Sequence, residues 1–298
     1  MSIRGVYQSP VSPGGSLFIE FSGIQEWANQ RLSEIIPIPP AVTSTLVETF
    51  GMRILISNDD GYLASGLTAL HGAIATTAES FVIAPDRNRS GASNSLTLTR
   101  PLRVHTAPNG FLYSDGTPTD CVHVGLTAFM DPEPDMVIAG INHGANLGDD
   151  VIYSGTVAAA MECRFLGFPA VAVSLVGSNP QHFESAAQVA LLLLQRVQRT
   201  PLPPDSIINV NVPDLPFDEI KGFQATRLGC RHKSEPVVRT KDPNGRDIYW
   251  VGPAGKEQDC GEGTDFFAVR EGFVSVTPLQ IDLTRHSQTD QVHQWLNA

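Results

Sequence analysis

The sequence predicts an α/β fold built on a doubly wound, mostly parallel sheet. Nearly continuous apolar runs of strand length alternate with segments of helical spacing, and runs of this kind are typical of strands buried on both faces. This alternation also favours right-handed crossovers. The expected strands span residues 53–57, 81–84, 136–139, 170–175 and 206–212. In such a sheet, ligands bind at the carboxyl ends of the strands.

Three helices are expected between these strands. Apolar residues recur at helical spacing after Ser65, after Thr117-Pro118 and after Ser154. Serine and threonine are favoured at the N-cap, and proline suits the first helical position. These residues therefore predict where the helices begin.

The chain changes character after Pro201. Strand-forming segments on either side of Asp242-Pro-Asn-Gly245 predict a projecting β-hairpin within the region of about 220–260. The spacing of Val292 and Trp295 predicts a C-terminal helix over 285–298. We expect this C-terminal extension to serve in oligomerisation.

Residues 1–51 form a proline-containing N-terminal extension that does not resemble a domain. Since Met52 directly precedes the first strong strand, we interpret the extension as a start-site artefact. Residues 52–298 are then expected to form a single α/β domain. The N-terminus carries no signal-peptide pattern, so the expected location is cytoplasmic.

Composition limits the partners of the chain. The 298 residues are 42% hydrophobic and carry a formal net charge of −11, which disfavours a nucleic-acid duplex or an anionic membrane as partner. No segment reaches the ~18 consecutive apolar residues of a membrane helix. The histidines show no compact metal-ligand spacing, so a histidine-based metal centre is not expected.

The first strand ends in Asp59-Asp60-Gly61, where two adjacent carboxylates need a positive partner. An Asx turn or an N-cap would explain such a pair equally well in isolation. Two further segments change that balance, because Ser90 follows the second strand and Asn142 follows the third. Two carboxylates, a hydroxyl and an amide form an all-oxygen set, which favours Mg²⁺, Mn²⁺ or Ca²⁺ over zinc.

The second acidic pair, Asp149-Asp150, is a rival metal site. It lies inside a loop and not at a strand end, so a supporting or capping role suits it better. His143 lies beside Asn142, where a contribution to the site and a solvent-facing role are both open. Either Arg87 or Arg89 could offset the charge of a phosphate.

Ser154-Gly155-Thr156 opens an alanine-rich helix. Free N–H groups at a helix start, together with two hydroxyls, favour phosphate binding over simple capping. Two other phosphate chemistries do not fit. Leu67 stands where a P-loop requires lysine, and no G-x-G-x-x-G follows the first strand.

In their order, these segments resemble the SurE (survival protein E) family of metal-dependent 5′-nucleotidases. The resemblance runs from Met52 to the C-terminus. It is carried by the blocks at 57–61, 84–91, 116–121, 140–142, 153–157, 263–266 and 272–278.

The resemblance implies a Rossmann-like core and one divalent metal ion, Mg²⁺ or Mn²⁺, held by Asp59, Asp60, Ser90 and Asn142. It also implies hydrolysis of nucleoside 5′-monophosphates and assembly into homodimers or homotetramers through the C-terminal segments. We assign catalysis to the two aspartates, with water or an aspartate as the nucleophile. The alternatives are an exopolyphosphatase or broad phosphatase with the same site, and a non-catalytic nucleotide or metal sensor.

Overall fold

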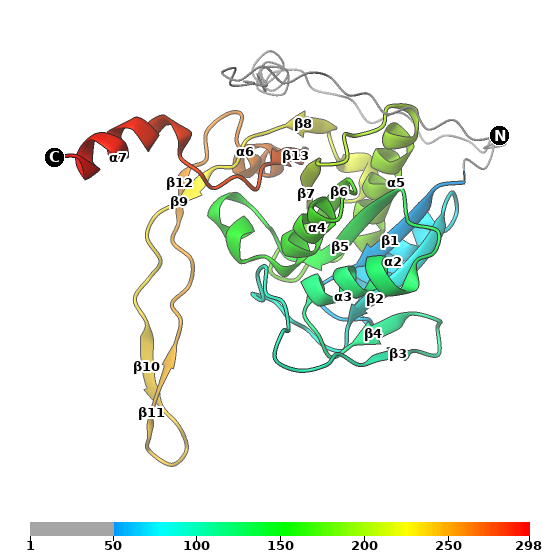
Figure 1. Cartoon of the computed structure of the whole chain (residues 1–298), viewed down its shortest axis with the longest axis horizontal. Coiled ribbons are helices and arrows are strands. Elements are labelled where there is room, and N and C mark those ends of the chain that lie inside the picture. The colour runs from blue at the N-terminus through cyan, green and yellow to red at the C-terminus, as the bar shows by residue number, and fades with distance from the viewer. Residues whose placement is uncertain (1–50) are drawn as a thin grey trace.

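In the computed structural model, residues 51–298 are described (Figure 1). The predicted extension, residues 1–51, lies outside the described residues except for Gly51. A nine-stranded sheet has the order β3-β4-β2-β1-β5-β6-β7-β13-β8. Its strands are β1 (Arg53–Ser57), β2 (Glu79–Pro85), β3 (Val104–Thr106), β4 (Leu112–Ser114), β5 (Met136–His143), β6 (Ala170–Val176), β7 (Ile207–Pro213), β8 (Phe223–Ala225) and β13 (Val274–Leu279).

The centre of the sheet is parallel, as predicted. From β4 through β2, β1, β5 and β6 to β7, each strand runs parallel to its neighbour. The strand β3 runs antiparallel to β4, and β13 runs antiparallel to β7. All the strands expected from the sequence are present, whereas β3, β4, β8 and β13 were not expected.

The order of the strands places a topological switch point at β1. The chain passes from β1 to β2 on one side and later returns to β5 on the other side, with Ser57 opposite Ala139. In open α/β sheets, ligands bind at the carboxyl ends of the strands that flank such a point. Asp59 follows β1 and Asn142 is the second-to-last residue of β5, so both lie at this crevice.

Helices cover both faces of the sheet. On one face, α2 (Ser65–Ile74) and α5 (Phe183–Arg199) share a core with Ile54 and Ile56 of β1. On the other face, α3 (Pro118–Val124) and α4 (Gly155–Phe165) share a core with Leu55. Alternate residues of a strand point to opposite faces, so this one strand contributes to two separate cores.

One crossover has the opposite hand to the others. The helices α2 and α5 share a face, yet the chain moves across the sheet in opposite directions from β1 to β2 and from β6 to β7. The unit β5-α4-β6 moves in the same direction as β6-α5-β7 but carries its helix on the other face. Because parallel crossovers are nearly always right-handed, we assign the left-handed crossing to β6-α5-β7.

The expectation of right-handed crossovers throughout is therefore wrong for this unit. The physical reason lies in how β6 is covered. Val173 and Leu175 of β6 are fully buried on the α2 face, while α3 and α4 both occupy the opposite face. Placing α5 beside α2 buries these side chains.

The predicted helix starts are largely confirmed. Thr117 caps α3 in a reciprocal capping box with Asp120, with Pro118 at the first helical position. Ser154 caps α4 by accepting the backbone N–H of Val157 at 3.0 Å. Ser65, in contrast, is the first residue of α2 and not its cap, because Ala64 occupies the N-cap without a side-chain hydrogen bond.

The C-terminal part adds a short helix, α6 (Asp265–Arg270), and a projecting arm. The arm starts at a small ladder of β9 (Cys230–Arg231) with β12 (Glu257–Asp259) and ends in a hairpin of β10 (Val238–Lys241) with β11 (Asp247–Trp250) (Figure 1). This hairpin confirms the predicted one.

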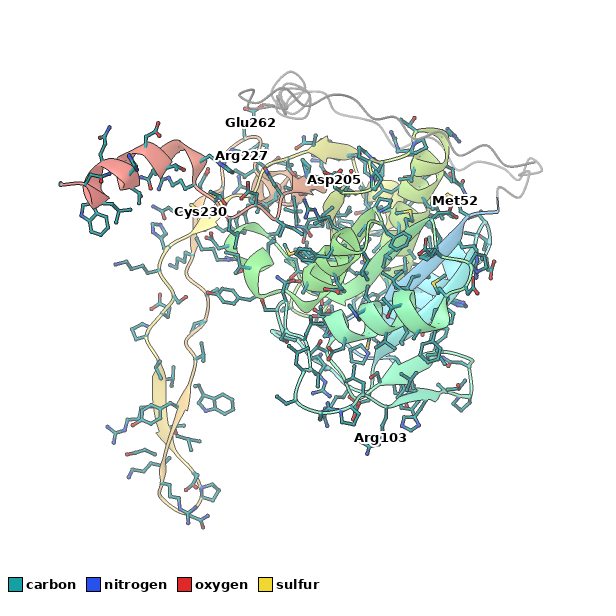
Figure 2. All side chains as sticks on the ribbon, in the orientation of Figure 1. Met52, Arg103, Asp205, Arg227, Cys230 and Glu262 are labelled. Carbon is teal, nitrogen blue, oxygen red and sulfur yellow. The ribbon has the colours of Figure 1, made fainter. Side chains whose placement is uncertain are left out.

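Figure 2 shows side chains standing out along both strands of the arm, away from the body of the protein. The last helix, α7 (Thr289–Leu296), also has no buried residue. Within residues 51–298, none of the helices is long and apolar enough to cross a membrane.

Candidate metal centre and phosphate site

The predicted carboxylate pair lies where β1 ends. Asn58 closes the turn that follows, because its side-chain amide exchanges two hydrogen bonds with the backbone of Gly61, at 3.0 and 3.2 Å. Asp59 is only 3% exposed, whereas Asp60 is half-buried. The turn therefore buries one carboxylate in the protein and presents the other to the crevice.

Two loops converge on this pair through hydrogen bonds. Asn88, from the loop after β2, donates its amide N–H to Asp60 Oδ1 at 3.1 Å. The backbone N–H of His143, at the end of β5, donates to Asp60 Oδ2 at 2.8 Å. The backbone N–H of Arg89 donates to the carbonyl oxygen of Asp59 at 2.7 Å. Asp60 thus links the ends of β1, β2 and β5.

The same contacts bring Ser90 and Asn142 to the pair. Ser90 is held by its backbone N–H, which donates to Asn88 Oδ1 at 2.8 Å. Asn142 lies next to His143, and its amide N–H donates to the carbonyl oxygen of Gly144 at 2.9 Å. That bond fixes the amide so that its oxygen is directed away from Gly144. Ser90 is therefore one hydrogen bond from Asn88, and Asn142 is next to His143 in the chain; Asn88 and His143 are the two residues that donate to Asp60.

The donor set fits a hard divalent cation. Ser90 Oγ and Asn142 Oδ1 accept no hydrogen bond from any group within residues 51–298. Oxygen atoms with free lone pairs beside a buried carboxylate are the ligands that Mg²⁺ and Mn²⁺ prefer. Among the residues that the structure describes, no group of three His, Cys, Asp or Glu side chains could hold a metal.

The rival acidic pair is already neutralised by an arginine. The guanidinium of Arg231 binds the Asp150 carboxylate at 2.7 to 3.1 Å, and the backbone N–H of Arg231 donates to Asp149 at 2.7 Å. Charge-assisted bonds of this kind satisfy most of the lone pairs of Asp150. These contacts give the pair a role in holding the arm to the 3₁₀ turn at Gly148–Tyr153.

Burial, together with a smaller contribution from the nearby charge of Asp60, raises the pKa of Asp59 from 3.8 to about 6. The hydroxyl of Thr156 donates to Asp59 Oδ1 and partly offsets both effects, as does the Thr156 backbone N–H. Without a cation, the folded protein therefore holds a proton on Asp59 more tightly than the unfolded chain does.

We expect the metal-free protein to lose stability as the pH rises from 4 to 7. The folded state binds more protons than the unfolded state between the two pKa values, so the stabilisation is present below pH 3.8 and is lost as the pH passes about 6. A difference of about two pKa units corresponds to about 3 kcal/mol. About half of this is lost between pH 5 and pH 8, which denaturant titrations in EDTA at these two pH values measure.

The matched variant for this measurement is Asp59→Asn, which keeps the shape but has no charge to bury. We expect it to be more stable than the wild type in EDTA at pH 8, with a smaller advantage at pH 5. Adding Mg²⁺ or Mn²⁺ raises the stability of the wild type only. A stability difference that is the same at both pH values would contradict the burial of this charge.

The start of α4 lies against Asp59, one of the candidate metal ligands. A Cβ atom on Gly155 would lie 2.8 Å from Asp59 Cβ and 2.9 Å from Asp59 Oδ2, so glycine is needed there for the helix to approach the carboxylate. Thr156 is fully buried and its hydroxyl is bound to Asp59, a contact the sequence did not suggest. Ser154 Oγ accepts a bond as the N-cap and retains its own O–H as a donor.

The two candidate arginines differ in their freedom. Arg89 donates to Asp86 at 3.1 Å and to the carbonyl oxygen of Asp115 at 2.9 Å. The Arg87 side chain is 67% exposed, and within residues 51–298 its one ion pair is with Asp86, at 3.7 Å. Arg87 is therefore the one that can move to a bound anion.

The sequence is similar to that of a known protein family. Residues 54–235 match the family model described as Survival protein SurE. The chain belongs to the SurE family. It is 67% identical over 245 residues to the 5′-nucleotidase SurE of Methylococcus capsulatus, covering 82% of this chain and 98% of the relative. It is 64% identical over 248 residues to the 5′-nucleotidase SurE of Halorhodospira halophila, covering 83% and 99%.

A solved SurE structure has the same fold. The crystal structure of the SurE protein from Aquifex aeolicus matches with a TM-score of 0.73 and 42% sequence identity, covering 83% of this chain and 100% of the other. The family assignment made from the sequence motifs is therefore confirmed, and so is the α/β fold. Sequence reasoning missed the contacts that Asn88, Gly155 and Thr156 make with the carboxylates.

Proposed function

We propose that the protein is a metal-dependent 5′-nucleotidase that hydrolyses nucleoside 5′-monophosphates to nucleoside and phosphate. The observation that carries the proposal is the convergence of Asp59, Asp60, Ser90 and Asn142 at the switch point of the sheet, directly against the start of α4. The printed names of the SurE relatives, 5′-nucleotidase, support it.

In this proposal, Asp59, Asp60, Ser90 and Asn142 hold one divalent ion, Mg²⁺ or Mn²⁺. Such an ion polarises a phosphoryl group and lowers the pKa of a bound water. Thr156 orients the Asp59 carboxylate, and Asp60 ties together the loops that carry the remaining ligands.

Phosphoryl oxygens would bind at the start of α4. Its positive dipole end, the backbone N–H of Gly155 and the hydroxyl of Ser154 favour an anion there. Arg87 supplies a positive charge from the loop after β2. Thr156 lies in the first turn of α4, but its hydroxyl is bound to Asp59, so we do not assign that hydroxyl to the phosphate.

Phosphate release from a panel of substrates tests the function. We expect nucleoside monophosphates to be hydrolysed faster than polyphosphate or p-nitrophenyl phosphate, with activity lost in EDTA and regained with Mg²⁺ or Mn²⁺. Faster release from polyphosphate would favour the exopolyphosphatase alternative. Metal-dependent binding of nucleotide without phosphate release would favour the sensor.

We also propose that the protein assembles as a homodimer or homotetramer through its C-terminal segments. All residues of β10 and β11 are exposed, including Trp250 at 64%, and α7 exposes Trp295 at 74%. Apolar side chains exposed together on a projecting element are typical of an interaction surface. The expected cytoplasmic location remains a prediction.

Shortening the arm tests the assembly. The two strands of the arm are close at Glu235, whose backbone N–H donates to the carbonyl oxygen of Pro253 at 3.1 Å. Replacing residues 236–252 by a short Gly-Ser turn removes the hairpin and leaves the main sheet intact. We expect a smaller oligomer by light scattering, and an unchanged mass would contradict a role of the hairpin.

A further inference from the structure

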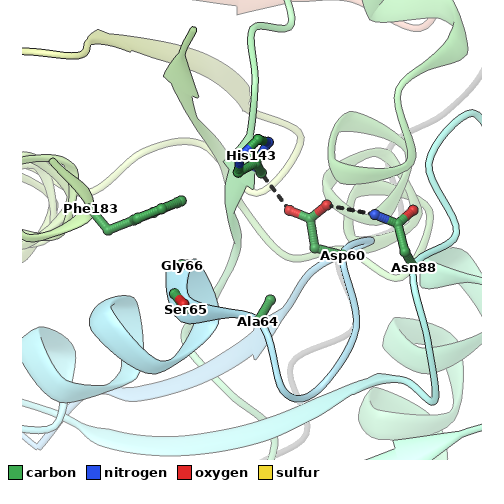
Figure 3. Close-up of a pocket in the computed structure, with 7 residues that line it drawn as sticks. All are labelled: Asp60, Ala64, Ser65, Gly66, Asn88, His143 and Phe183. Carbon is green, nitrogen blue, oxygen red and sulfur yellow. Dashed lines mark hydrogen bonds between the residues drawn. The ribbon is translucent and has the colours of Figure 1, made fainter. Parts of the chain in front are cut away.

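A pocket of about 250 Å³ opens beside the metal centre (Figure 3). Asp60 and Asn88 form one end, and Phe183, the first residue of α5, forms the other. His143 and the first residues of α2, Ala64 to Gly66, line the space between them. The pocket is therefore polar at the metal centre and aromatic at its far end.

The left-handed crossover explains why an aromatic ring lies here. It sets α5 on the same face of the sheet as α2. Both helices follow parallel strands and therefore begin at the same, carboxyl edge of the sheet. Gly66 completes the fit, because a Cβ atom there would lie 2.1 Å from the carbonyl oxygen of Ile141 and 3.1 Å from the ring of Phe183. A right-handed crossing would place Phe183 on the opposite face.

The start of α5 is held in place by hydrogen bonds. Asp214 Oδ1 accepts from the backbone N–H of Gln181 at 2.9 Å, from the backbone N–H of His182 at 2.8 Å and from His182 Nδ1 at 2.8 Å. Phe183 directly follows this anchor. Its ring centroid lies 6.2 Å from that of His143, with the ring planes at 33°. The aromatic end is thus fixed before any ligand binds.

The order of these chemical groups matches the order of groups in a nucleotide. A phosphoryl group bound between the proposed metal ion and the start of α4 leaves the rest of the molecule to extend along the pocket toward Phe183. Drug-sized ligands occupy sites of about 300–1,000 Å³, so a pocket of about 250 Å³ suits one nucleoside and not a polymer. Aromatic rings bind nucleobases by stacking, with little dependence on the base.

We propose that this pocket is the nucleoside subsite of the enzyme, with Phe183 as the residue on which the base stacks and His143 as its neighbour along the wall. The inference rests on the proposed 5′-nucleotidase function and names the part of the substrate that the site selects. Ala64 and Ser65 lie between the ring and Asp60, where the ribose passes.

Comparing AMP with ribose 5-phosphate isolates the base, because the two substrates share the ribose and the phosphate. In the metal-loaded, full-length enzyme, we expect Phe183→Ala to lower kcat/KM for AMP at least about ten-fold, mainly through KM, because stacking on one aromatic ring is lost. For ribose 5-phosphate, we expect kcat/KM to change less than about two-fold. This substrate has no base to stack on Phe183, so the substitution removes no binding energy from it.

Phe165→Ala is the matched control, since Phe165 is 62% exposed at the end of α4 and does not line the pocket. We expect this variant to have the kcat/KM of the wild type for both AMP and ribose 5-phosphate. Phe183→Trp keeps an aromatic face and retains most of the activity on AMP. Equal losses on AMP and ribose 5-phosphate in Phe183→Ala would overturn the proposal, because they would indicate damage to the metal centre.

Calorimetric titration with adenosine tests the pocket without turnover. We expect adenosine to bind the wild type and the Phe165→Ala variant, and to bind Phe183→Ala at least about ten-fold more weakly. Equal binding to all three proteins, or no binding to the wild type, would overturn the subsite. If the wild type binds adenosine but releases no phosphate from AMP, the proposed function fails while the subsite stands.

Discussion

Asp59→Asn is expected to lower phosphate release from AMP at least about 1,000-fold, because electrostatic stabilisation by a bound metal is worth several kcal/mol. The substitution removes the charge that binds the cation but keeps an oxygen for the Thr156 hydroxyl. The fold is therefore retained, and the metal-free variant is more stable than the wild type above pH 6. Measurements of kcat/KM and of the free energy of unfolding on the same samples test both statements.

Asp149→Asn is the matched control, because it makes the same chemical change in the rival acidic pair, whose contacts are with Arg231. We expect it to keep activity within a few-fold of the wild type, as surface substitutions away from the site usually do. A reversed result, with an active Asp59→Asn and an inactive Asp149→Asn, would move the metal centre to the second pair.

Asp60→Asn is expected to be equally inactive but less stable. Asp60 Oδ1 and Oδ2 each accept an N–H, one from Asn88 and one from His143. An asparagine amide can accept only on its oxygen, so one donor would face the new NH₂ group and lose its bond. The two variants are thus expected to differ in stability although we expect both to be inactive.

The sequence groups the proposed metal ligands because these residues lie at or near strand ends. Ends of neighbouring parallel strands meet at one edge of a sheet, so residues after β1, β2 and β5 gather there whatever the side-chain details. Asp59, Ser90 and Asn142 could therefore be grouped from local pattern alone. The roles of Thr156 and Asn88 depend on individual hydrogen bonds to the two carboxylates, and the residue types alone do not predict these bonds.

The aromatic end of the pocket could not be predicted in the same way. Ala186, Ala190 and Leu194 have the spacing of a buried helical face, so the existence of α5 could be predicted from the sequence. Knowing that α5 exists would still not have placed it. The usual right-handed rule puts this helix on the wrong face, and only the burial of β6 on both sides reverses it.

The second large effect is expected for Gly155→Ala, which changes no charged or hydrogen-bonding group. The added Cβ would lie 2.8 Å from Asp59 Cβ and 2.9 Å from Asp59 Oδ2, so the carboxylate and the start of α4 must move apart. Displacements of about 1 Å at a reacting centre cost about 100-fold in rate. We expect kcat/KM for AMP to fall about 10- to 100-fold, with weaker binding of Mn²⁺.

Gly72→Ala provides the control for adding a methyl group to a helix. Gly72 lies in α2, and a Cβ atom there would meet no heavy atom within 4 Å. We expect unchanged activity and a gain in stability of up to about 1 kcal/mol, the difference in helix propensity between glycine and alanine. Gly155→Ala instead loses about 1–3 kcal/mol from overpacking. If Gly155→Ala were as active as Gly72→Ala, close contact between α4 and Asp59 would not be what orients the carboxylate.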